Sequence, residues 1–158
     1  MPVQARHRQS RRQDRRYPAL VGLYLVIFGP DDDELGAVDV GRYSDFGRFR
    51  DAVTSHLEPL GWGTRFPVLM LHGDDDGEWT PAEAAELERE LLTINTEFAA
   101  LPPEPLPVGW QTALAAEFNL VPATLGECFF DVNGESVLDG LVDLSRIAVR
   151  QNLPISFQ

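Results

Sequence analysis

Apolar runs and amphipathic segments alternate along the chain and predict both strands and helices. Residues 21–28 are rich in β-branched and aromatic side chains, which is typical of a strand covered on both faces. The turn-type residues 29–33 separate this run from a second strand at 35–40, so we expect an antiparallel hairpin with an acidic loop. The uninterrupted apolar run at 67–71 predicts a third strand, in the interior of the sheet.

Four further segments carry apolar residues at helical spacing and predict helices. Ser44 is expected to cap the first helix and Ser136 the last. Thr80, Pro81 and Glu83 form a capping-box signature at the start of the second helix. The four helices are expected to begin near residues 44, 81, 110 and 137 and to end near residues 57, 100, 118 and 151.

The remaining segments are short. Residues 101–107 contain four prolines and predict a stiff, extended connector. Residues 129–132 suit a short strand that ends in an Asn133-Gly134 turn, and residues 154–157 suit a final edge strand. The order of elements predicts an α+β fold, with a small mixed or antiparallel sheet covered by about four helices.

Length and composition favour one domain preceded by a tail. A chain of 158 residues with 44% hydrophobic content is long enough to bury a core without disulfides. Residues 1–16 hold six arginines and lack apolar periodicity, so they predict a disordered basic tail, and residues 17–158 a single α+β domain. The Arg11-Arg12 pair is typical of a twin-arginine export signal, but the polar Gln13-Asp14 pair that follows favours a plain extension.

The net charge of the chain limits the classes of molecule that it can bind. The net charge is −12, and it divides into +5 over residues 1–16 and −17 over residues 17–158. A body this acidic should repel nucleic acid and anionic membranes and attract basic proteins. The one cysteine, Cys128, is expected to be buried, and a chain without a disulfide suits the reducing cytoplasm.

The strongest candidate for chemistry is an acidic loop at residues 72–79. Calcium is disfavoured because His72 stands where an EF-hand needs an oxygen ligand, and because Glu83 already serves the helix cap. A metal-dependent hydrolase that uses His72, Asp74 and Asp76 is an alternative, but the sequence places no further ligands beside them. We therefore expect no catalytic residue, no bound metal and no cofactor.

The same loop also suits protein binding. Trp79 lies among acids, and we expect it to face solvent as an aromatic anchor with a charged rim. The turn at residues 31–33 offers a second acidic surface. A solvated acidic turn, in a structural module with no catalysis, is the remaining interpretation. The expected partner-binding residues are Asp74, Asp75, Asp76, Glu78, Trp79, Asp31, Asp32 and Asp33.

Residues 66–81 resemble the immunity protein 70 family of bacterial polymorphic toxin systems. The resemblance extends to residues 22–24, 40–46 and 154–158, and covers about residues 20–158. It implies a non-enzymatic, cytoplasmic protein that binds and neutralises a cognate toxin, and it brings no catalytic residues or cofactors. An acidic inhibitor would fit a basic toxin such as a nuclease.

Overall fold

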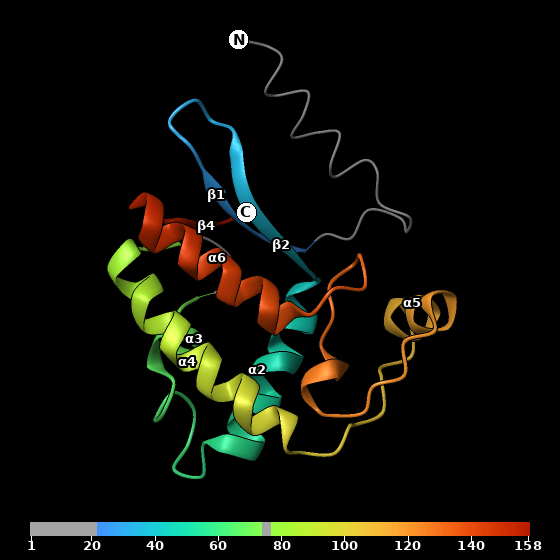
Figure 1. Ribbon diagram of the computed structural model, residues 1–158. Coiled ribbons are helices and arrows are strands. Elements are labelled where there is room, and N and C mark those ends of the chain that lie inside the picture. The colour runs from blue at the N-terminus through green and yellow to red at the C-terminus, as the bar shows by residue number, and fades with distance from the viewer. Residues whose placement is uncertain (1–21, 74–76) are drawn as a thin grey trace.

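The sheet consists of four antiparallel strands in the order β2-β1-β4-β3. The computed structural model describes residues 22–73 and 77–158, and over these residues the fold is α+β, as the sequence predicts (Figure 1). The first two strands form the expected hairpin, closed by a hydrogen bond from the Gly29 N–H to the Asp33 carbonyl. The strands are β1 (Leu23–Phe28), β2 (Glu34–Gly41), β3 (Glu78–Trp79) and β4 (Ile155–Phe157).

Helices cover the sheet, and α4 and α6 lie side by side against it, whereas α5 stands at the periphery (Figure 1). A glycine in β2, Gly36, and a glycine in α6, Gly140, let these two elements approach closely. A Cβ at Gly36 would come within 2.9 Å of Ile147 Cδ1, and a Cβ at Gly140 within 3.1 Å of Val38 Cγ2. The helices are α2 (Tyr43–Leu57), α3 (Pro67–Leu71), α4 (Pro81–Ala99), α5 (Trp110–Phe118), the short 3-10 helix η1 (Gly126–Cys128) and α6 (Val137–Gln151).

The core lies between the sheet and the helices. Its centre is aromatic: the Phe49 ring contacts Phe98 and Phe129 edge-on, at centroid distances of 6.4 and 5.3 Å. The periodic apolar faces predicted for α2, α4 and α6 are buried in this core. Cys128 is also fully buried, and burial raises the pKa of its thiol, so it behaves as a small core residue.

The prediction of a strand at 67–71 is wrong, because these residues form helix α3. Pro67 occupies the first helical turn, where a missing N–H costs nothing. The Glu90 carboxylate of α4 then accepts the N–H groups of Val68 and Leu69, at 3.1 and 2.9 Å, in place of a strand partner. The apolar pattern of a five-residue run is the same for a buried strand and for a short helix. Here the Glu90 carboxylate, which comes from another helix, supplies the hydrogen-bond acceptor that the start of α3 needs.

The prediction that Trp79 faces solvent is also wrong. Its side chain is fully buried, its indole N–H donates to the Val68 carbonyl, and its ring packs edge-on against Phe157 at 4.6 Å. Glu78 and Trp79 form β3, which takes the edge of the sheet. Residues 155–157 are therefore an interior strand between β1 and β3, not the edge strand that was predicted.

Two smaller predictions need correction. Helix α2 begins at Tyr43 with Arg42 as its N-cap residue, so Ser44 lies inside the first turn, and the Asp45 carboxylate accepts the Arg42 N–H at 2.7 Å. Residues 129–132 contribute only an isolated bridge from Phe130 to Ser136 in place of a strand. The turn at residues 131–134 is present, closed by the Gly134 N–H on the Asp131 carbonyl.

The capping box of α4 is confirmed and gives a first test. The Thr80 hydroxyl accepts the Glu83 N–H, and the Glu83 carboxylate accepts the Thr80 N–H, both at 3.1 Å. We expect Thr80→Ala to lower the free energy of unfolding by about 1 kcal/mol, because a helix N–H loses its acceptor. Urea titration measures the change.

Thr96→Ala is the matched control, since Thr96 is an exposed threonine of the same helix, away from the cap. It should change stability by less than about 0.5 kcal/mol. Equal losses in the two variants would show that the box contributes nothing.

Candidate protein-binding groove

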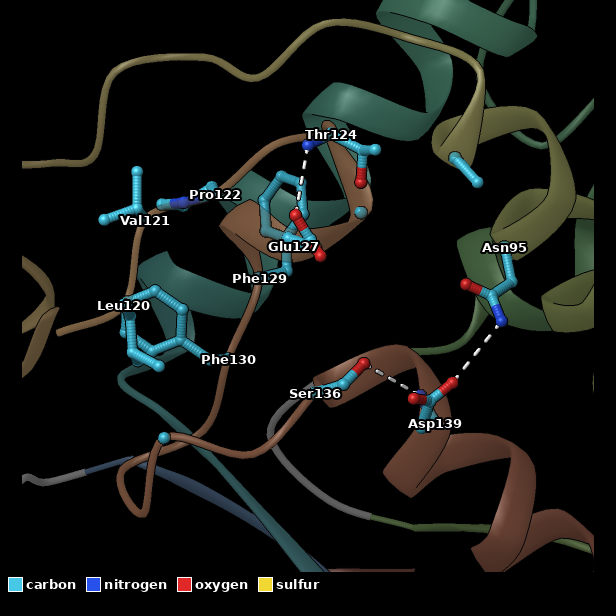
Figure 2. Close-up of a pocket in the computed structure, with 13 residues that line it drawn as sticks. Asn95, Leu120, Val121, Pro122, Thr124, Glu127, Phe129, Phe130, Ser136 and Asp139 are labelled. Atoms are coloured by element: carbon cyan, nitrogen blue, oxygen red, sulfur yellow. Dashed lines mark hydrogen bonds between the residues drawn. The ribbon is translucent and has the colours of Figure 1, made fainter. Parts of the chain in front are cut away.

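A groove of about 480 Å³ opens where α4, the segment after α5 and the start of α6 meet (Figure 2). Residues from three separate stretches of the chain converge on it. This size falls within the range of about 300–1,000 Å³ that is usual for binding pockets. It is lined by Asn95, Ala99, Leu120, Val121, Pro122, Thr124, Gly126, Glu127, Phe129, Phe130, Gly134, Ser136 and Asp139.

The floor of the groove is rigid because it belongs to the core. Phe129 and Phe130 are 3% and 6% exposed, and they are packed from below by Phe49 and Trp110, respectively. Arg48 also lies below the floor, with its guanidinium carbon 4.4 Å from the centre of the Phe129 ring. The Arg48 side chain donates to the Cys128 carbonyl and is not among the lining residues.

One rim is an apolar ridge held in place by a carboxylate. Val121 is 86% exposed, and it follows the left-handed Asn119 residue that ends α5. The Glu127 carboxylate accepts the N–H groups of Ala123 and Thr124 at 2.5 and 3.2 Å, which fixes the chain beyond the ridge. Figure 2 shows Val121 and Pro122 on one side of the groove, with Glu127 between them and Asn95.

The opposite rim joins α4 to α6. The Asn95 amide donates to the Asp139 carboxylate over a long 3.4 Å, and the Ser136 hydroxyl accepts the Asp139 N–H as the predicted cap (Figure 2). Asp139 stands in the first turn of α6, where its charge offsets the positive end of the helix dipole. Two carboxylates, Glu127 and Asp139, therefore face one groove, and no arginine or histidine is among its described lining residues.

Helix α5, which leads into the apolar ridge, is attached through Asp45. The Asp45 carboxylate accepts the Trp110 indole N–H at 3.1 Å and the Gln111 amide at 2.6 Å, besides the Arg42 N–H. Gly41, with φ of +93°, leaves the space for this contact, since a Cβ there would lie 2.7 Å from the carboxylate.

The residues predicted to bind a partner lie elsewhere. Asp31, Asp32 and Asp33 are exposed at the tip of the β1–β2 hairpin, and Glu78 is exposed on the edge strand β3. Asp74, Asp75 and Asp76 lie outside the described residues. Because β2 packs near its hairpin end on the C-terminal half of α6, the hairpin and the groove lie at opposite ends of that helix.

The hydrolase alternative has little structural support in the described part of the chain. His72 stacks on Phe157 at 4.2 Å, and its two ring nitrogens lie against the carbonyls of Gly73 and Glu78. These contacts attach the end of α3 to the sheet. Among residues 22–73 and 77–158, no group of three or more His, Cys, Asp or Glu side chains is placed to hold a metal ion.

The model of the immunity protein 70 family matches residues 30–157, which is most of the chain and includes the groove. The chain belongs to the immunity protein 70 family. No curated protein and no solved structure matches it.

Membership of this family assigns the chain an immunity protein role. Sequence reasoning found the family but missed the groove as a site. It placed Ser136 only as a helix cap, and neither Glu127 nor Val121 carries a periodic signal. No helix in the described residues is long and apolar enough to cross a membrane.

The attachment of α5 gives a second test. We expect Asp45→Ala to destabilise the protein by about 1–3 kcal/mol, because three N–H donors lose their acceptor. Amide hydrogen exchange should accelerate in residues 109–122 more than in α4. Asp51→Ala, an exposed acid of the same helix, is the control and should leave exchange in α5 unchanged. Uniform acceleration over the whole chain would contradict a local attachment.

The buried Asp131 carboxyl, which lies next to the groove, predicts a dependence of stability on pH. Burial raises the pKa of this carboxyl, against hydrogen bonds from the Glu135 and Asn133 N–H groups. A raised native pKa means that its share of stability is present below the unfolded value of about 4 and is lost as the pH rises through the native pKa.

Asp131→Asn keeps an acceptor oxygen but carries no charge. We therefore expect the free energy of unfolding of the wild type, relative to this variant, to fall as the pH is raised from about 3.5 to 7. Urea titrations across this range measure it. Asp143→Asn, at an exposed position of α6, is the control. A difference that grows with pH would show that the charged form is favoured by folding.

Proposed function

We propose that this chain neutralises a cognate toxin by binding it, and that the toxin presents a basic surface. The immunity protein 70 match over residues 30–157 is the observation that carries the proposal. The formal charge of −17 over residues 17–158 supports a basic partner, because complementary charge accelerates encounter and disfavours wrong partners. A nuclease is one class of toxin with such a surface. We propose that binding takes place in the cytoplasm and without catalysis by this chain.

The exposed acids of the hairpin and of β3 fit a steering role in this proposal. Asp31, Asp32, Asp33 and Glu78 are solvent-exposed, so in about 0.15 M salt their field reaches roughly 8 Å. Charges at such positions alter the association rate more than the dissociation rate. The buried Trp79 has no place in this surface, since a contact with its ring would require β3 to leave the sheet.

The test is complex formation with the toxin encoded beside the gene, using a catalytically inactive toxin variant. We expect a stable complex whose association slows as the salt concentration rises from about 50 to 500 mM. A chain that does not bind this toxin, and does not protect cells that express it, would contradict the proposal.

Charge reversal refines the test. The double variant Asp31→Lys with Glu78→Lys should slow association several-fold and leave the dissociation rate within about twofold of the wild type. Stopped-flow mixing measures both rates. Thr93→Lys, an exposed position of α4, is a control for adding a lysine outside the acidic sites. An unchanged association rate in the double variant would remove these acids from the steering surface.

A further inference from the structure

We propose that the groove between α4, the ridge after α5 and the start of α6 receives a basic side chain of the toxin, together with an apolar neighbour of that side chain. The inference rests on the proposed function and adds the place and chemistry of the close contact. It differs from the acidic loop and hairpin, which the sequence indicated, because it combines a cavity, an apolar rim and two carboxylates.

The shape of the groove suits a long side chain with an apolar stem and a charged end. Its floor is formed by the edges of Phe129 and Phe130, and Leu120 lines one wall. Arginine and lysine bury their methylene groups against such surfaces while the charged end stays near polar atoms. Arg48 makes a contact of this kind from below the floor, where its guanidinium carbon lies 4.4 Å from the centre of the Phe129 ring.

The carboxylates that line the groove favour a positively charged side chain. Glu127, from the segment after α5, and Asp139, from the first turn of α6, both line the groove, and Asn95 adds an amide group beside them (Figure 2). A guanidinium with its planar set of donors pairs well with carboxylates in a partly desolvated site. The N-terminus of α6, which would otherwise favour an anion, is capped by Ser136 and carries Asp139 in its first turn.

The apolar rim explains why the occupant needs an apolar neighbour. Val121 is 86% exposed, and Phe118, just before it, is 41% exposed. The Phe118 ring approaches Gly134, which lines the groove, since a Cβ at Gly134 would lie 3.4 Å from its Cδ2. A partner that covers these side chains removes their apolar surface from water, and an apolar neighbour of the basic side chain would supply that cover.

The groove is held in shape before binding. The Glu127 hydrogen bonds to Ala123 and Thr124 fix the chain just beyond the ridge, and the core packing of Phe129 fixes the floor. A preformed site avoids part of the ordering cost of association. The groove alone is smaller than a stable interface, which buries about 800 Å² per partner, so we infer that it forms the centre of a larger contact.

The decisive variant is Val121→Arg, which places a competing cation at the rim. The matched control is Val108→Arg, because Val108 is a fully exposed valine that does not line the groove. Both variants add the same charge, so long-range effects cancel in the comparison. We expect Val121→Arg to raise the dissociation rate from the inactive toxin by about 10–100-fold. Val108→Arg should stay within about threefold of the wild type.

A second pair of variants tests the sign of the charge. Glu127→Gln with Asp139→Asn keeps acceptor oxygens for the neighbouring N–H groups but removes both charges. We expect it to raise the dissociation rate about tenfold. Asp31→Asn with Asp32→Asn removes the same charge at the hairpin and should alter association only. Thermal unfolding of each variant verifies that it is folded.

The outcomes separate the two proposals. If the wild type does not bind the toxin, the proposed function fails and the groove assignment fails with it. If the wild type binds and both groove variants dissociate like their controls, the groove assignment alone is wrong. Tighter binding by Val121→Arg would likewise overturn it, because the groove would then face an acidic segment of the toxin.

Discussion

The packing of α6 against both the sheet and α4 is the constraint on which the rest of the molecule depends. One face of α6 is buried along its whole length, and it packs closely on β2 at Gly36 and Gly140, where a Cβ would come within 2.9 and 3.1 Å of the facing side chain. Its N-terminus forms one rim of the groove, and its C-terminal half supports the hairpin end of the sheet. The position of α6 therefore sets the separation between the two acidic regions of the surface.

Many of the acids that make the chain so negative also shape its backbone. Glu58 is 2% exposed and accepts the N–H groups of Gly63, Arg65 and Phe66, which fixes the loop before α3. Glu90 and Glu127 accept pairs of N–H groups in the same way. Each of these carboxylates also counts towards the formal charge of −17 over residues 17–158. Acidity in this immunity protein thus serves the fold and the proposed encounter with a basic toxin together.

The sequence predicted correctly those features that depend on interactions between residues close together in the chain. The hairpin, the capping box at Thr80, the helix face from Phe46 to Leu57 and the Ser136 cap all follow from neighbouring residues, and the structure confirms them. Two of the wrong predictions depend on contacts between residues far apart in the chain. Residues 67–71 form a helix whose first N–H groups are bound by Glu90, and Trp79 is buried because β3 pairs with β4.

The groove escaped prediction for the same reason. Asn95, Glu127 and Asp139 come from three segments of the chain, and only the packing of α4 against α6 and the attachment of α5 through Asp45 bring them to one cavity. The acidic loop can be recognised from the sequence because its acids are adjacent. Adjacent acids are easy to see in a sequence, whereas convergent ones require the fold.

Amide hydrogen exchange on the complex with the inactive toxin tests the central claim most directly. If the groove is the centre of the contact, exchange slows on binding in residues 118–139 and at the C-terminal end of α4, where Asn95 and Ala99 line the groove, and the hairpin tip changes little. If protection is confined to the hairpin and β3, with residues 118–139 exchanging as in the free protein, the groove is not where the toxin binds.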